Sequence, residues 1–357
     1  MVDQHPAAPF DTEAGLADVR EAFMDGMKSS DTDWSNFALA LFRWQFAHND
    51  VYAEFVHHLG IDPRQVRSSE AIPCLPVEAF KHHQVKSTSW EVAKTFRSSG
   101  TSGVVSRSQH CLDDQGWEWY HHVTAASWQH VWRTPASEHQ WLGLLPGYLG
   151  REDASLLAMV EEFMHQSGHP PRMFMRDHKA ILSCLEQWIQ EGCRKHMVLV
   201  GVTWAILDWL DAGLLPEALN NAEVAGKFVL LETGGMKGRG VEPIRQEVHE
   251  AIHRRLPGIQ IASEYGMTEM MSQAYALDGI HQKFPPWVLP VVRDARDPMV
   301  QLATGRTGRL DVMDLANIHS CAFLATSDLA QHHREGLQIL GRVDRSEVRG
   351  CSLLASE

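Results

Sequence analysis

The chain has 357 residues, 44% hydrophobic and 22% charged, which is long enough for one large domain or two ordinary ones and is normal for a globular protein. Its formal net charge of −13 argues against nucleic acid or an anionic membrane as the main partner. An anionic ligand would therefore need a local cluster of basic side chains and backbone donors.

Targeting signals and metal motifs are absent from the sequence. The N-terminus is neither basic nor apolar, and no run of 18 apolar residues occurs, so we expect no signal peptide, no membrane span and a cytoplasmic location. The histidines form no HExxH motif, and the cysteines form no CxxC pair, which favours free thiols over disulfides or zinc. The six cysteines are Cys74, Cys111, Cys184, Cys193, Cys321 and Cys351.

The chain opens with two predicted amphipathic helices. Leu16, Val19, Phe23 and Met27 share one face of the first, and Phe37, Leu41, Trp44 and Ala47 share one face of the second. Two prolines in the following segment, 72–81, predict an extended connector.

Beyond residue 110, buried-strand patterns alternate with helical stripes. The expected strands are 140–146, 197–202, 227–233 and 259–266. This alternation predicts an α/β fold with a mainly parallel sheet covered by helices on both faces, in which ligands bind beyond the carboxyl ends of the strands. The last third is richer in strands, at 309–313 and 321–330, and predicts a small β subdomain.

A loop rich in glycine and hydroxyl groups lies between the connector and the first of these strands. It is a poor helix and a poor strand, but its backbone N–H groups and hydroxyls suit a bound phosphate. No Gly-Lys-Ser/Thr follows, so it is not a P-loop. The loop residues are Ser98, Ser99, Gly100, Thr101, Ser102 and Gly103.

Two further glycine-bearing turns, 232–240 and 263–270, follow predicted strands. In the second, Tyr265 beside Gly266 can lay its ring on a flat base, Thr268 can donate to a phosphate, and Glu269 can hold Mg²⁺. The alternative is structural, with Tyr265 in the core and Glu269 in solvent. A parallel sheet would bring these turns to one edge.

The segments "SSGTSG", "YGMTE", "ATSDLA" and "GRVDRSEVRG" resemble, in order and spacing, the core motifs of the adenylate-forming superfamily. "LPVEAFK", "FRSSGTSGVVSRSQH" and "GRVDRSEVRGCSLL" resemble more closely the acyl-protein synthetases of bacterial luminescence. The resemblance implies the large N-terminal domain of that fold. We expect a helical segment over 1–70, an adenylate-forming core over 71–342 and a short tail over 343–357.

The resemblance implies that a carboxylic acid attacks the α-phosphate of ATP and that an acyl-adenylate forms. The loop 98–103 would wrap the phosphates, and Gly234 and Gly235 would line the adenine side, with Tyr265 stacked on the base. Thr268 would contact the α-phosphate, and Glu269 would bind Mg²⁺. Asp328 would hold the ribose hydroxyls, assisted by Arg342; these last two roles rest on the resemblance alone.

The sequence departs from the superfamily at two points. The lysine usual after the loop glycines is missing, and Arg107 is expected to supply its charge. The superfamily normally continues beyond the "GRxD" segment with a small domain that carries a further lysine. The sequence ends at Glu357, so we expect Lys237, Arg239 or Arg107 to take over as cations.

Cys351 lies in the segment where acyl-protein synthetases carry the acyl-accepting cysteine. A thiolate is a good nucleophile and yields an energised thioester, so Cys351 is the expected acyl carrier, although a buried structural thiol is the alternative. The resemblance implies a fatty acid substrate and a reductase partner. Two other hypotheses stay open: a ligase that passes the acyl group to coenzyme A or a small acceptor, and a nucleotide-binding module without catalysis.

Overall fold

The structure is a computed structural model that describes residues 8–99, 106–148, 150–234 and 245–342. The chain divides into two compact units. The first unit comprises Met1–Ala79, Val85–Ser89 and Pro286–Glu357, and the second comprises Phe80–Gln84 and Trp90–Pro285. Within the described ranges, no helix is long and apolar enough to cross a membrane.

The first unit combines the N-terminal helices with the C-terminal strands. Its sheet has the order β14-β13-β12-β11, with antiparallel neighbours, and β1 lies parallel to β13. Its elements are α1 (Leu16–Lys28), α2 (Trp34–His48), α3 (Asp50–His58), the 3₁₀ turn Ser69–Ala71, β1 (Leu75–Pro76), β11 (Val288–Arg293), β12 (Thr307–Asp314), β13 (Phe323–His332) and β14 (Leu337–Arg342).

One buried glutamine explains why segments so far apart in the sequence form one unit. Gln45 in α2 donates to the carbonyls of Asn317 and Ser320 at 3.0 Å each, and it accepts from the backbone N–H of Ala322 at 2.9 Å. Because an unpaired buried amide is costly, these three bonds fix the helix to the turn between β12 and β13.

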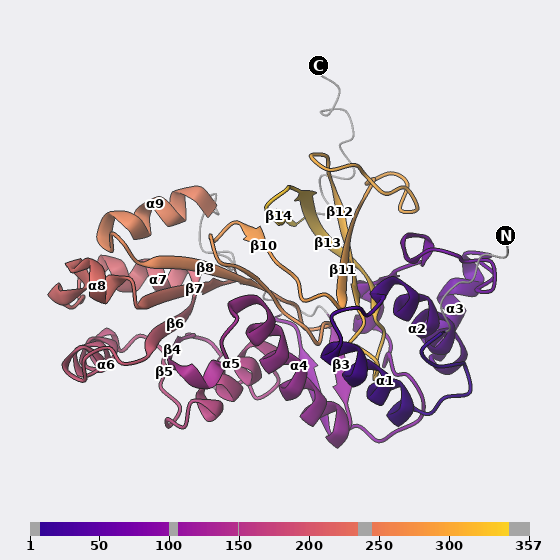
Figure 1. Ribbon diagram of the computed structural model, residues 1–357, viewed down its shortest axis with the longest axis horizontal. Helices are drawn as coiled ribbons and strands as arrows, with labels where there is room; N and C mark the ends of the chain where they lie inside the picture. Colours follow the sequence, from indigo (N-terminus) through magenta and orange to yellow (C-terminus); the bar gives the residue numbers. More distant parts are fainter. Residues whose placement is uncertain (1–7, 100–105, 149, 235–244, 343–357) are drawn as a thin grey trace, which may run out of the picture. The chain divides into compact units, whose positions relative to one another are not determined.

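The second unit is an α/β sheet of order β5-β4-β6-β7-β8-β9, parallel except for β9 (Figure 1). Its strands are β2 (Lys94–Arg97), β3 (Gln109–Leu112), β4 (His139–Leu144), β5 (Met173–Phe174), β6 (His196–Val202), β7 (Phe228–Thr233), β8 (Gln260–Tyr265), β9 (Ala274–Ala276) and β10 (His281–Gln282). Its helices are α4 (Asp114–Trp132), α5 (Ser155–Gln166), α6 (His178–Gln190), α7 (Thr203–Asp211), α8 (Ala222–Ala225) and α9 (Arg245–Arg255).

Helices cover both faces of this sheet. Figure 1 shows α7, α8 and α9 on one face and α4, α5 and α6 on the other. All six residues of β7 are buried, as a strand covered on both faces must be. The expected α/β fold with a parallel sheet is therefore confirmed, and the carboxyl ends of β7 and β8 lie side by side.

Candidate functional site

The second and third glycine-bearing turns leave the carboxyl ends of neighbouring strands. Gly234 follows β7 directly, and its φ of +69° lies in the left-handed region that favours glycine. Tyr265 is the last residue of β8, and Gly266 follows it. The β7–β8 register places Thr233 opposite Glu264.

A hydrogen bond joins these two strand ends. The Thr233 hydroxyl donates to Oε2 of Glu264 at 2.5 Å. The other carboxyl oxygen lies against Gly266, where an added Cβ would come within 2.5 Å of it, so a larger residue at 266 would displace this carboxyl group. Burial raises the pKa of Glu264 to about 7, although the hydrogen bond from Thr233 acts in the opposite direction. The carboxyl group therefore titrates near neutral pH.

On the α7–α9 side of β7, a buried polar cluster holds the Gly234 turn. The Thr203 hydroxyl lies 2.7 Å from Oε1 of Glu232 and 2.9 Å from the carbonyl oxygen of Gly234. Nε2 of His249 lies 3.3 Å from the other oxygen of Glu232. Burial opposes ionisation of Glu232, but its hydrogen bond with His249, the Arg245 charge and the bond from Thr203 together lower its pKa.

The hydroxyl-rich loop connects the two strands of an antiparallel hairpin, β2 and β3, with Arg97 opposite Gln109. The Ser98 N–H donates to the carbonyl of Ser108, and the Ser108 N–H donates to the hydroxyl of Ser98, both at 3.1 Å. The hairpin therefore continues as far as Ser98 and Ser108.

At the base of this loop, Arg107 and Arg151 both form ion pairs with Asp153. Nε of Arg107 donates to the carbonyl of Ser98 at 2.6 Å, and its guanidinium pairs with Oδ2 of Asp153 at 2.9 Å. Arg151 pairs with Oδ1 of Asp153 at 3.1 Å and donates to the carbonyl of Arg97 at 3.1 Å. The charge of Arg107 is thus already paired with Asp153.

The hairpin is tied to the third turn through His110 in β3. Nδ1 of His110 lies 2.9 Å from the carbonyl oxygen of Thr268. Together with the Thr233–Glu264 bond, this contact connects all three glycine-bearing turns within the second unit.

Tyr265 and Glu269 differ in exposure. Tyr265 is half-buried, with its ring 6.1 Å from that of Phe284 in an edge-on arrangement. Glu269 is only 4% exposed. The alternative in which Glu269 lies in solvent is therefore wrong, because its side chain is buried.

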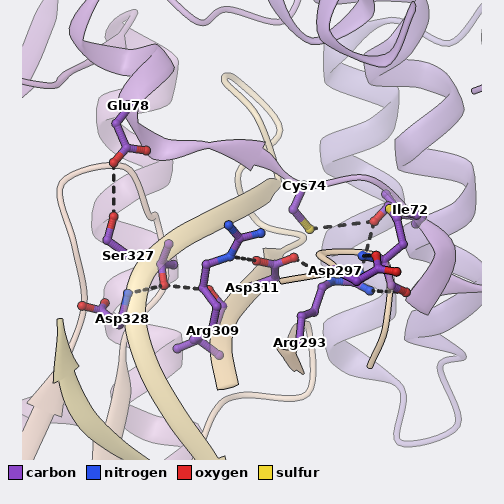
Figure 2. Close-up of polar contacts among 12 residues, drawn as sticks. Ile72, Cys74, Glu78, Arg293, Asp297, Arg309, Asp311, Ser327 and Asp328 are labelled. Carbon is purple, nitrogen blue, oxygen red and sulfur yellow. Dashed lines mark hydrogen bonds and ion pairs between the residues drawn. The ribbon is translucent and has the colours of Figure 1, made fainter. Parts of the chain in front are cut away.

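Asp328 and Arg342 lie in the first unit, on paired strands. The β13–β14 register places them opposite each other, and Nε of Arg342 lies 3.0 Å from Oδ1 of Asp328. Asp328 is 4% exposed. Figure 2 shows Asp328 beside Ser327, whose hydroxyl donates to Glu78 at 3.2 Å.

The figure also shows a buried ion pair in the same sheet. Nε of Arg293 lies 2.7 Å from Oδ2 of Asp311 (Figure 2). Another nitrogen of Arg293 donates to the carbonyl of Glu70 at 2.8 Å. This pair fixes the segment before β1 to the sheet that carries Asp328.

Several expected site residues lie outside the described residues. They are Gly100, Thr101, Ser102, Gly103, Gly235, Lys237, Arg239 and Cys351. Ser99 is described and directly follows the paired part of the hairpin.

The described residues contain no group of three or more histidine, cysteine, aspartate or glutamate side chains able to hold a metal ion. Mg²⁺ is often bound by one or two protein carboxylates together with water and substrate phosphates. Such an ion needs no cluster of protein ligands, so the assignment of Glu269 as a Mg²⁺ ligand stays a prediction.

The chain resembles one known protein family and several solved structures. A scan against protein-family models matches "Acyl-protein synthetase, LuxE" over residues 27–118. A search of curated proteins found no match. ATP-bound MatB from Rhodopseudomonas palustris superposes with a TM-score of 0.52 and 18% identity over 70% of this chain and 48% of that one.

A second enzyme matches more of the chain. Open 2-hydroxyisobutyryl-CoA ligase, in complex with 2-HIB-AMP and CoA, has a TM-score of 0.59 and 13% identity over 96% of this chain and 77% of that one. The same ligase in the postadenylation state has a TM-score of 0.61.

The chain has the fold of the adenylate-forming enzymes. Its sequence resembles the acyl-protein synthetases, as expected. It spans 48% of the length of the MatB structures and about three quarters of the ligase.

Sequence reasoning missed four polar residues of the site. Glu264 lies within the quoted "SEYGMTEM" motif and His110 within "FRSSGTSGVVSRSQH", but neither was assigned a role. Asp153 and Thr203 have no local motif. Asp153 pairs with Arg107, 46 residues away, as well as with the nearby Arg151, and Thr203 contacts Glu232, 29 residues away, so no local signal points to their place at the site.

Proposed function

We propose that this protein uses ATP to activate a carboxylic acid as its acyl-adenylate and then transfers the acyl group to the thiol of Cys351. The carboxylate oxygen attacks the α-phosphorus, and pyrophosphate leaves. The thiolate then attacks the acyl carbon, and AMP leaves.

The observation that best supports adenylation is the connection of the three turns. The His110–Thr268 and Thr233–Glu264 bonds bring the hydroxyl-rich hairpin, the Gly234 turn and the 265–269 turn together at one edge of a parallel sheet. In such sheets, ligands bind beyond the carboxyl ends of the strands. The fold of the neighbours and the ATP bound to MatB support a nucleotide as this ligand.

We assign each predicted site residue to one part of the bound nucleotide. Residues 98–103 bind the phosphates, Thr268 contacts the α-phosphate, and Tyr265 stacks on the base beside Gly234 and Gly235. Asp328 holds the ribose hydroxyls, and Arg342 assists it. A Mg²⁺ ion held by Glu269 would neutralise phosphate charge. Lys237, Arg239 or Arg107 would supply the further positive charge; Arg107 donates to the carbonyl of Ser98 and is also paired with Asp153.

We propose a fatty acid as the substrate and an acyl-accepting reductase as the partner. Support comes from the acyl-protein synthetase match over residues 27–118. The second candidate is transfer of the acyl group to coenzyme A. It is favoured by the likeness to a ligase whose structure contains both 2-HIB-AMP and CoA.

One experiment separates these functions. The protein is incubated with ATP, Mg²⁺ and a panel of isotopically labelled fatty and aromatic acids, with and without coenzyme A, and then analysed by intact-mass spectrometry. Our proposal predicts a labelled acyl adduct on Cys351 without coenzyme A. Release of acyl-CoA with no adduct would support the second candidate, and ATP binding without pyrophosphate release would indicate a binding module.

A further inference from the structure

His110 is a fully buried histidine that the proposed reaction does not use. It lies in β3, and its side chain is 0% exposed. The rings of Phe80 and Phe96 approach it edge-on, with centroids at 6.0 and 6.5 Å. Phe96 also lies opposite it in the hairpin register.

The contact with Thr268 defines the state of this ring. A carbonyl oxygen can only accept a hydrogen bond, so the 2.9 Å contact requires Nδ1 of His110 to carry the hydrogen. The imidazole is therefore held as a donor toward one particular peptide group. That group is 158 residues away in the sequence, so the bond is a specific tertiary connection.

The His110–Thr268 hydrogen bond matters because of the peptide group to which the accepting oxygen belongs. It belongs to the peptide unit that joins Thr268 to Glu269. A rotation of this peptide would move both the side chain proposed to contact the α-phosphate and the carboxylate proposed to hold Mg²⁺. The donor lies on β3, the strand that follows the hydroxyl-rich loop, so the bond connects the β2–β3 hairpin directly to the 265–269 turn.

We propose that His110 is a positioning residue that fixes the Thr268–Glu269 peptide relative to the phosphate-binding hairpin. This role rests on the proposed adenylation. It does not require His110 to touch the substrate. Displacement of reacting groups by about 1 Å can cost on the order of 100-fold in rate, so an effect on turnover is expected without a direct contact.

The test uses variants that separate the donor from the shape of the side chain. H110N keeps an N–H donor at nearly the place of Nδ1, because the amide nitrogen is the same number of bonds from the backbone. H110F keeps a flat ring without a donor, and H110L provides a second donor-free variant if H110F does not fold. The matched control is His139, a buried histidine at the opposite end of the sheet whose Nδ1 lies 3.2 Å from the carbonyl of Pro135.

Two measurements are made on each purified protein. The first is acid-dependent ATP–pyrophosphate exchange per folded molecule, with kcat, KM for ATP and the Mg²⁺ requirement determined separately. The second is hydrogen–deuterium exchange of peptides covering residues 266–270 without ligand, which reports on the turn independently of activity.

We expect H110F to lose tenfold or more in kcat and to need more Mg²⁺, while H110N recovers most of the activity. Deuterium uptake over 266–270 should rise in H110F and stay at the wild-type level in H110N and H139F. H139F should lose stability but keep its exchange activity per folded molecule.

The proposal is overturned if H110F or H110L matches the wild type in both measurements, or if H139F loses as much activity as H110F. If the wild-type protein shows no acid-dependent exchange, adenylation itself is wrong, whereas the deuterium measurement still decides whether His110 fixes the turn.

Discussion

The hydroxyl of Thr233 donates a hydrogen bond to the carboxyl group of Glu264 across the ends of β7 and β8. The two residues are register partners, so their side chains project from the same face of the sheet. This bond places the Glu264 carboxyl group at the edge of the sheet where the proposed site lies. Burial raises the pKa of this group to about 7.

The raised pKa predicts a pH-dependent stability. The folded protein holds the Glu264 proton more tightly than the unfolded chain, in which the ordinary pKa is 4.5. The free energy of unfolding should therefore fall as pH rises from about 4.5 to about 7, by about 3 kcal/mol in total from this group.

Urea unfolding of the wild type and of Glu264→Gln between pH 4 and 8 measures this effect. Glutamine keeps an oxygen for Thr233 but does not ionise, so the variant should gain stability relative to the wild type across this interval. A difference that stays constant with pH would show that Glu264 titrates normally.

We expect Asp153 to support ATP binding by holding the two arginines at the base of the hydroxyl-rich loop. Asp153→Ala leaves Arg107 and Arg151 without the carboxylate they share, so we expect a raised KM for ATP and a loss of stability of about 1 kcal/mol for these partly exposed pairs. Asp211→Ala breaks the surface Arg255–Asp211 pair and serves as the control. Equal KM values for the two variants in pyrophosphate exchange would refute a role of Asp153 in ATP binding.

Arg342 should act on ATP binding through Asp328. Its side chain is 71% exposed, so Arg342→Ala should cost less than about 1 kcal/mol of stability. If the pair binds ribose, Arg342→Ala and Asp328→Asn should both raise the KM for ATP and leave the KM for the acid unchanged. The kinetic comparison with 2′-deoxy-ATP gives the check: the penalty for the missing hydroxyl should shrink in Asp328→Asn.

The second half-reaction should depend on Cys351 alone. A serine hydroxyl is scarcely ionised at neutral pH, so Cys351→Ser should still exchange pyrophosphate but should no longer retain labelled acid. Cys321→Ala is a poor control because its thiol is fully buried; Cys184→Ala, at a partly buried thiol, should retain both activities. Hydroxylamine-sensitive labelling that persists in Cys351→Ser would assign the acyl group to another residue.

The parallel strands could be predicted from the sequence because they are continuous apolar runs. The strand expected at 197–202 is observed as His196–Val202, and the one expected at 227–233 as Phe228–Thr233. Helix α4 was not predicted. Its buried face mixes Val123 and Val131 with Trp119, Tyr120 and Ser127, so aromatic and polar side chains interrupt the aliphatic stripe that marks a helix.

The polar connections could not be predicted because they join distant segments. Nothing near His110 in the sequence indicates a bond to Thr268, and nothing near Gln45 indicates bonds to the turn before β13. The expected domain boundary after residue 70 was drawn along the chain and stays a prediction. A unit assembled from both ends of the chain leaves no contiguous signal in the sequence.

Adenylation is tested most directly by ATP–pyrophosphate exchange, measured with Mg²⁺ across a panel of carboxylic acids for the wild type and Glu269→Gln. Exchange reports reversible acyl-adenylate formation and does not require the terminal thiol. We predict acid-dependent exchange by the wild type and a loss of at least about 100-fold in the folded Glu269→Gln variant. No exchange with any acid, or equal exchange by the folded variant, would contradict this prediction.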